Sequence, residues 1–308
     1  MSPVNRASAG YPDTIELTAG RFAMLAPAKI NLTLRVLGRR RDGYHELDTV
    51  FQEISLADRL EFGSSLEWRL DIEGADLDAG EDNLVTRAAR GLSAASGVPC
   101  RAHVILRKEI PVDGGLGGGS SDAAVALIGL SRLWGLNWTR ARLHELAAEL
   151  GSDCAFFLYG GLARGRGRGE VLSLDEGSVP GHVVLVVPPF GVSTAWAYAE
   201  GRFGLTDEQK SGIFNIRAEH ATGAVWPDGV PSNDLENIVL ARYDELGRVK
   251  RRLLECGASA ALLSGSGSAV YAVFEERSRA MHAAQQHGAP YRTYLCHAVS
   301  RARAAHDG

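Results

Sequence analysis

Apolar and polar residues alternate along the segment that starts at Ala28. A period of two predicts a β-strand with one buried face, and it places Lys29 and Asn31 together on the opposite face. On this pattern we expect Lys29 to be an ordinary solvated lysine. The apolar positions of the strand are Ile30, Leu32, Leu34 and Val36.

Other segments carry equally simple patterns. Alternating or continuous apolar runs predict strands at 48–62, 66–72, 102–106 and 182–187, a strand, loop and strand across 260–274, and a strand at 292–299. Apolar residues spaced for one helical face predict helices at 84–92, 122–134, 140–150, 235–255 and 276–287, the third capped by Thr139. Strands and helices are interleaved without a regular strand–helix–strand rhythm, which favours an α+β fold.

The length of 308 residues is ordinary for two domains and long for one. Residues 1–20 are polar and predict a loose extension rather than a signal peptide or an anchor. Residues 200–230 are poorly patterned. The longest apolar runs, such as 183–187, are too short to span a bilayer, so we expect no membrane partner.

Composition excludes several classes of function. The net charge of −4 argues against nucleic acid as a partner, and the short glycine–arginine run at 165–170 is too brief for RNA-binding repeats. The four cysteines include no closely spaced pair, so neither a disulfide framework nor a zinc site is indicated. We expect reduced thiols in a cytoplasmic protein. The sequence carries no signal of the oligomeric state.

Glycine is the compositional outlier, with 36 residues, and its densest cluster directly precedes a predicted helix. Glycines let backbone amides approach an anion, and the helix N-terminus adds unpaired amides and partial positive charge. The segment therefore predicts a phosphate-binding loop, against the simpler alternative of a flexible surface loop. It is not a Walker A loop, because no Gly-Lys-Ser/Thr follows. Its residues are Pro111, Val112, Asp113, Gly114, Gly115, Leu116, Gly117, Gly118, Gly119, Ser120 and Ser121.

Three further positions have both a structural and a functional interpretation. Asp153 follows a helix stop at Gly151, so it is either the N-cap of a short apolar turn or a carboxylate placed to accept a proton. His45 alone is more typical of a surface loop than of a ligand. The run 264–268 is either a small-residue hairpin turn or a second backbone approach to a ligand.

Taken together, three of these segments resemble the motifs of the GHMP kinase superfamily, named after galactokinase and the homoserine, mevalonate and phosphomevalonate kinases. The motifs are Pro27–Leu32, Pro111–Ser121 and Leu263–Ser268. The likeness extends from about residue 23 to 274. The runs 38–47, 115–124 and 151–153 are similar to the branch of the superfamily that phosphorylates the 2-hydroxyl of 4-diphosphocytidyl-2-C-methyl-D-erythritol.

The resemblance implies a two-lobed fold with the active site in the cleft between the lobes. Residues 1–168 would form an ATP-binding domain and residues 169–308 a substrate-binding domain. ATP and Mg²⁺ would be the cofactors, and a cytidine diphosphate-linked methylerythritol the substrate. Homoserine and mevalonate are the alternative phosphoryl acceptors, and the Gly-Tyr-His segment at residues 43–45 argues against both. The alternative from a different functional class is a catalytically inactive homologue that only senses a nucleotide or metabolite.

The resemblance also assigns roles to residues. Asp153 would be the general base and Lys29 its charged partner, which would stabilise negative charge on the substrate oxygen or on a phosphoryl oxygen during the transfer. Residues 111–121 would bind ATP, and Ser120 is a possible Mg²⁺ ligand. The implied substrate-binding residues are Tyr44 and Tyr198, which sandwich the cytosine, His45, which bonds its edge, and Asn31 and Thr194, which line the path of the methylerythritol diphosphate. The third-motif loop would comprise Ser264, Gly265, Ser266 and Gly267.

Asp113 departs from the family pattern, which has a small residue at this place in the loop. A carboxylate close to phosphate groups would repel them. ATP binding therefore requires that Asp113 points away from the nucleotide or contacts a cation.

Overall fold

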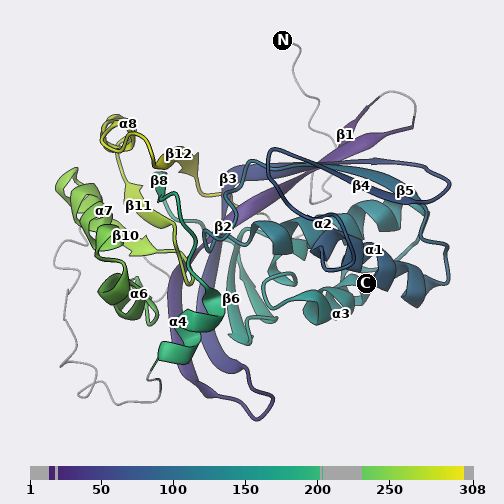
Figure 1. The fold of residues 1–308 in the computed structure, drawn as a ribbon, viewed down its shortest axis with the longest axis horizontal. Coiled ribbons are helices and arrows are strands. Elements are labelled where there is room, and N and C mark those ends of the chain that lie inside the picture. The colour runs from purple at the N-terminus through teal and green to yellow at the C-terminus, as the bar shows by residue number, and fades with distance from the viewer. Residues whose placement is uncertain (1–13, 18–19, 202, 204–230, 302–308) are drawn as a thin grey trace.

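The computed structural model describes residues 14–17, 20–201, 203 and 231–301 (Figure 1). The sequence expectations for residues 1–13 and 204–230 therefore lie outside the described residues. The expected loose extension was wrong at its end, because Thr14–Glu16 form a strand, β1, that pairs antiparallel with β2 (Phe22–Arg39). The backbone groups at that edge of β2 thereby gain hydrogen-bond partners.

The first sheet is built around β2 and β3 (His45–Gly63), two long antiparallel strands whose register shifts at three places. Its central order is β1-β2-β3-β5-β4, with β6 and β7 continuing from β3 and β9 paired to β2. The remaining strands are β4 (Trp68–Glu73), β5 (Ala102–Arg107), β6 (Leu162–Gly167), β7 (Val171–Asp175) and β9 (Ser232–Asn233).

Helices α1 (Leu84–Ser96), α2 (Gly118–Leu133) and α3 (Arg140–Leu150) pack with the short helix η1 (Phe156–Leu158) against this sheet (Figure 1). The predicted N-cap is confirmed, since the Thr139 side chain accepts a hydrogen bond from Arg142 N. Gly129 lets α2 approach the sheet, because a Cβ there would lie 2.3 Å from the ring of Phe62.

A second sheet has the order β10-β11-β8-β12. Its strands are β8 (His182–Val187), β10 (Ala260–Leu263), β11 (Val270–Phe274) and β12 (Arg292–His297), and its helices are α4 (Thr194–Glu200), α6 (Glu236–Arg242), α7 (Asp244–Glu255) and α8 (Arg277–Gln285). The single helix predicted at 235–255 is wrong. The chain breaks at Tyr243, which leaves helical geometry with ψ 71° and stacks on Phe190 at 5.3 Å.

The two sheets share a core through the middle of β2. Ala28, Ile30 and Leu32 pack there with side chains of β8 and β11, and Tyr271 Oη donates a hydrogen bond to the Asn31 carbonyl at 2.9 Å. β2 is consequently buried on both faces at this point. The expectation that Lys29 is solvated is wrong, because its side chain is only 4% exposed.

The fold consists of two β-sheets, each packed with helices (Figure 1). This arrangement confirms the α+β prediction. Residue 168 lies in the connection between β6 and β7, which form one antiparallel hairpin of the first sheet. The division into nucleotide-binding and substrate-binding domains at that residue stays a prediction. Among the described residues, no helix is both long and apolar enough to cross a membrane.

Candidate active site

A cavity of about 1230 Å³ lies where the two sheets meet, and most of the predicted site residues line it. Ser121, Ser264 and Gly267 do not. Ser121 is fully buried in the first turn of α2, behind the glycine loop. The predicted residues in the lining are Lys29, Asn31, Tyr44, His45, Pro111, Val112, Asp113, Gly114, Gly115, Leu116, Gly117, Gly118, Gly119, Ser120, Asp153, Thr194, Tyr198, Gly265 and Ser266.

The glycine loop ends directly in α2, whose N-cap is Gly117 with φ 72°. No side chain caps this helix, so its first amides are available to an anion in the cavity. Gly115 also has φ 72°, and a Cβ there would lie 2.1 Å from the carbonyl oxygen of Ser264. A Cβ on Gly117 would lie 2.8 Å from the Phe157 ring. Glycine is therefore required at both positions by the close packing of the loop, in addition to leaving the loop amides accessible.

The run 264–268 lies against the glycine loop. Ser268 N donates to the Asp113 carbonyl at 3.2 Å, and Ser264 Oγ donates to the Gly115 carbonyl at 3.0 Å. Gly265 and Ser266 line the cavity. The two glycine-rich segments, far apart in the sequence, thus form one wall.

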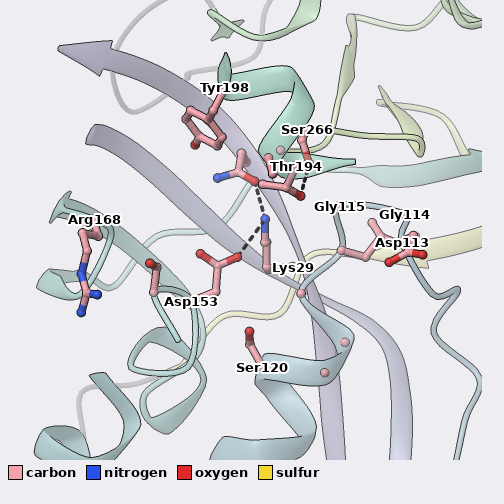
Figure 2. A pocket seen from close by; sticks show the side chains of 18 of the residues that line it. Lys29, Asp113, Gly114, Gly115, Ser120, Asp153, Arg168, Thr194, Tyr198 and Ser266 are labelled. Carbon is pink, nitrogen blue, oxygen red and sulfur yellow. Dashed lines mark hydrogen bonds and ion pairs between the residues drawn. The ribbon is translucent and has the colours of Figure 1, made fainter. Parts of the chain in front are cut away.

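Lys29 connects that wall to Asp153. Its Nζ lies 3.4 Å from Asp153 Oδ2 and donates to Asn31 Oδ1 at 2.5 Å (Figure 2). Asn31 Nδ2 in turn donates to Thr49 Oγ1 at 2.8 Å, which fixes the amide orientation. A Cβ on Gly117 would lie 3.2 Å from Lys29 Cε, so the lysine stem packs directly on the loop.

Asp153 is not the N-cap of the short helix that follows. That helix, η1, begins after Ala155 and has no side-chain cap. The Asp153 carboxylate is instead turned toward Lys29 at the cavity and is 30% exposed (Figure 2). A carboxylate that is both paired with an ammonium and open to the cavity can accept a proton from a bound hydroxyl group.

Aromatic rings form the far end of the cavity. His45 stacks on Tyr198 with ring centroids 5.0 Å apart, and Phe203 meets His45 edge-on at 5.3 Å. Burial lowers the pKa of His45, with a smaller contribution from the charge of Arg39. Burial also raises the pKa of Tyr198. His45 is therefore part of the cavity wall and not a free surface residue.

Thr194, at the start of α4, shares a hydrogen bond of 2.8 Å with Ser266 (Figure 2). This contact joins the aromatic end of the cavity to the glycine-rich wall. Asp113 is exposed, and a Cβ on Gly191 would lie 2.6 Å from its Cβ. In Figure 2 its carboxylate lies on the other side of Gly114 and Gly115 from Lys29.

Lys108 is a cavity residue that the sequence patterns did not reveal. Its Nζ donates to Asp122 Oδ2 at 2.7 Å and also contacts the carboxylate of Asp58. All three side chains are buried, and Asp58 Oδ1 accepts a hydrogen bond from Ile110 N at 2.8 Å. Burial raises the pKa of Asp122 to about 8, an effect that the Lys108 charge opposes.

This triad ties the strand before the glycine loop to the helix after it. The signal was absent from the sequence because Lys108 stands among charged residues that look like an exposed segment. Among the described residues, no group of three or more His, Cys, Asp or Glu side chains is arranged to hold a metal ion. Ser120 offers a hydroxyl oxygen in the cavity lining.

Comparison with known proteins gives consistent matches. The model of the GHMP kinases N terminal domain matches residues 83–161, and that of the GHMP kinases C terminal domain matches residues 227–293. A protein of Pelotomaculum thermopropionicum named 4-diphosphocytidyl-2-C-methyl-D-erythritol kinase is 46% identical over 274 residues, covering 87% of this chain and 93% of its own. A protein of the same name from Solibacter usitatus is 43% identical, covering 90% of this chain and 89% of its own.

Solved structures agree with the sequence relatives. A crystal structure of 4-(cytidine 5'-diphospho)-2C-methyl-D-erythritol kinase has a TM-score of 0.72 and 36% identity, covering 90% of this chain and 98% of that one. Homoserine kinase from Cytophaga hutchinsonii has a TM-score of 0.65 at 17% identity, covering 93% of this chain and 97% of its own. The second likeness concerns the fold alone.

Proposed function

Because this chain belongs to the 4-diphosphocytidyl-2-C-methyl-D-erythritol kinase family of the GHMP kinases, we propose that it phosphorylates the 2-hydroxyl of 4-diphosphocytidyl-2-C-methyl-D-erythritol with ATP. The reaction belongs to the non-mevalonate route to isoprenoid precursors. One observation carries most of the support from the site: Lys29 lies between the glycine loop and Asp153.

In this proposal Asp153 is the general base. Its carboxylate takes the proton of the 2-hydroxyl while the hydroxyl oxygen attacks the outermost phosphorus of ATP, and ADP leaves. Lys29 stabilises the negative charge that develops on the reacting oxygens. Asn31, held by Thr49, keeps the Lys29 ammonium at the cavity and lines the substrate path.

The ATP site is assigned to residues 111–121 and the N-terminus of α2. Backbone amides of the loop and of the first helical turn bind the phosphate oxygens. Residues 264–267 act mainly by holding the loop. When bound, Mg²⁺ would neutralise phosphate charge, and Ser120 is the residue of this chain that we assign to it, with water and ATP oxygens as the other ligands.

The cytidyl end of the substrate is assigned to the aromatic end of the cavity. Tyr44 and Tyr198 hold the cytosine ring, while His45 bonds its edge and Thr194 lies along the diphosphate. The lowered pKa of His45 keeps its imidazole neutral at pH 7, so one ring nitrogen donates and the other accepts. We also place the enzyme in the cytoplasm, where reduced thiols are maintained; its four cysteines are all free.

The test is a phosphoryl-transfer assay on the purified full chain. With Mg²⁺ and ATP, we expect stoichiometric ADP and a phosphorylated product from 4-diphosphocytidyl-2-C-methyl-D-erythritol, identified by mass spectrometry. Homoserine and mevalonate are the comparison acceptors, because solved structures of similar fold are named homoserine kinase and mevalonate kinase. Turnover of either one, without turnover of the cytidyl compound, would refute the proposed substrate.

A further inference from the structure

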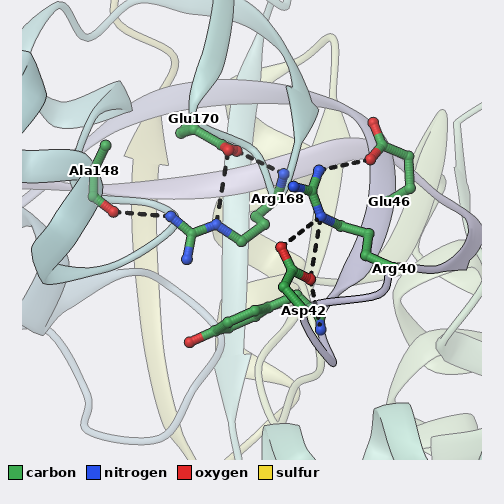
Figure 3. A network of polar contacts seen from close by, with 7 residues as sticks. Arg40, Asp42, Glu46, Ala148, Arg168 and Glu170 are labelled. Atoms are coloured by element: carbon green, nitrogen blue, oxygen red, sulfur yellow. Dashed lines mark hydrogen bonds and ion pairs between the residues drawn. The ribbon is translucent and has the colours of Figure 1, made fainter.

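The turn between β2 and β3 presents Tyr44 at the edge of the cavity. The residue is 54% exposed, although it also lines the cavity. Asp42 Oδ1 accepts a hydrogen bond from Tyr44 N at 3.1 Å, and Arg40 pairs with Asp42 and with Glu46 (Figure 3). These contacts fix the backbone of the turn but leave the ring to be held by something else.

Arg168 supplies that contact from another part of the sheet. Its guanidinium carbon lies 4.8 Å from the centroid of the Tyr44 ring, a cation–π distance. Arg168 itself is held in place: Nη2 donates to the Ala148 carbonyl at 3.0 Å, and Nε lies 3.7 Å from Glu170 Oε1 (Figure 3). Its side chain is only 25% exposed.

The glycine–arginine run at 165–170 thereby gains a structural role. Gly165 allows close packing, because a Cβ there would lie 2.6 Å from the Phe51 ring. Gly167 has φ 72°, and the Glu170 carboxylate accepts a hydrogen bond from Arg168 N at 2.6 Å. The turn directs Arg168 into the cavity lining, whereas Arg166, two residues earlier, is exposed and outside it.

We propose that Arg168 is a positioning residue for the nucleobase end of the substrate, acting through Tyr44. The inference rests on the proposed function. A cation held over one face of the Tyr44 ring limits its rotation and leaves the other face for a pyrimidine. The residue therefore determines affinity for the cytidine diphosphate part of the substrate and has little effect on the chemical step.

The proposal predicts that loss of Arg168 weakens binding of the cytidyl substrate but leaves kcat and the KM of ATP nearly unchanged. Arg168→Met removes the cation while keeping a long apolar side chain. A cation–π contact of this kind corresponds to about a three- to tenfold change in affinity. We expect a rise of that size in the Kd of CDP and in the KM of the cytidyl substrate, with kcat and the KM of ATP within about twofold of the parent.

The experiment is a double-mutant cycle measured by calorimetry with CDP as the probe. The variants are Arg168→Met, Tyr44→Ala and the double substitution, with Arg166→Met as the matched control from the same run. If Arg168 acts through Tyr44, its substitution in the Tyr44→Ala background should change the Kd by less than about twofold. Arg168→Lys retains a cation and should restore part of the affinity.

Equal effects of Arg168→Met with and without Tyr44 would overturn the inference, and so would an unchanged Kd. An equal loss of CDP affinity in Arg166→Met would show that the effect comes from general surface charge, and this result would overturn the inference as well. Thermal unfolding of each variant separates lost binding from lost folding; if Arg168→Met is unfolded, Arg168→Lys and Arg168→Gln complete the comparison. A parent chain that neither binds CDP nor phosphorylates the cytidyl substrate refutes the proposed function together with this inference. A parent that does both, combined with an additive cycle, refutes the inference alone.

Discussion

The ammonium of Lys29 lies 3.4 Å from the carboxylate of Asp153, although one residue comes from an early strand and the other from the connection after α3. Lys29 is almost completely buried and Asp153 is partly open to the cavity. The pair thus consists of a buried ammonium and a carboxylate open to the cavity, and it adjoins the N-terminus of α2 through Gly117.

Asp153→Asn should lower kcat by about 100-fold or more, because general-base catalysis contributes about 10²–10⁴ in rate. The asparagine has nearly the same shape but cannot accept the proton. ATP affinity should stay within about threefold, since the glycine loop is unchanged. Steady-state kinetics and calorimetry with an ATP analogue measure the two quantities. A variant with near-parental kcat would remove Asp153 from the mechanism.

Lys29→Met should lower kcat more than it raises either KM. Removal of one fixed charge at a reacting oxygen costs about 10²–10³ in rate. Arg35→Met, an exposed position on the same strand, is the control and should be neutral. If Lys29→Met changes KM alone, the lysine contributes to binding and not to the chemical step.

Gly115→Ala should impair ATP binding and stability together. The new Cβ would lie 2.1 Å from the Ser264 carbonyl oxygen, so the loop must move away from the run 264–268. Gly135→Ala is the matched control, because Gly135 has φ 68° but nothing lies within 4 Å of its added Cβ. The control should lose only about 1–2 kcal/mol, the strain of a left-handed backbone, with no change in the KM of ATP. Equal effects of both substitutions on the KM of ATP would argue against contact between the two loops.

Lys108→Met should be among the most destabilising single substitutions in the chain. It leaves the Asp58 carboxylate and the Asp122 carboxyl group buried without the Lys108 ammonium, a change that costs about 3–5 kcal/mol. Arg90→Met breaks the exposed pair with Glu81 and should cost less than about 1 kcal/mol. Urea unfolding of both variants gives the comparison, and similar losses would contradict the structural role of the triad.

Cys154, next to the proposed base, should resist alkylation in the native protein. Burial raises the pKa of its thiol to about 12, and the same holds for Cys296. Because the thiolate is the reactive form, very little of either thiol is reactive at pH 8. We expect iodoacetamide to leave activity intact and Cys154 unmodified, whereas the urea-unfolded chain reacts at all four cysteines. Rapid inactivation with label on Cys154 would show that this region opens in solution.

Local signals in the sequence predicted most of the elements. Thr139 caps α3 as expected, and the glycine cluster does lead straight into a helix. The helix cap and the loop-to-helix junction each depend only on residues close by in the sequence, so the local pattern was enough to predict them. The break at Tyr243 was missed because it accompanies a ring contact with Phe190, far away in the sequence.

The sequence alone determined the α+β class, the glycine-rich segment that leads directly into a helix, and the likeness to GHMP kinases. Only the tertiary structure decided which groups Lys29, Lys108 and Arg168 contact. A lysine in an alternating strand has the same local signature whether water or a carboxylate lies opposite. The opposing group is supplied by long-range packing: the second sheet covers one face of β2, and the glycine loop and Asp153 cover the other.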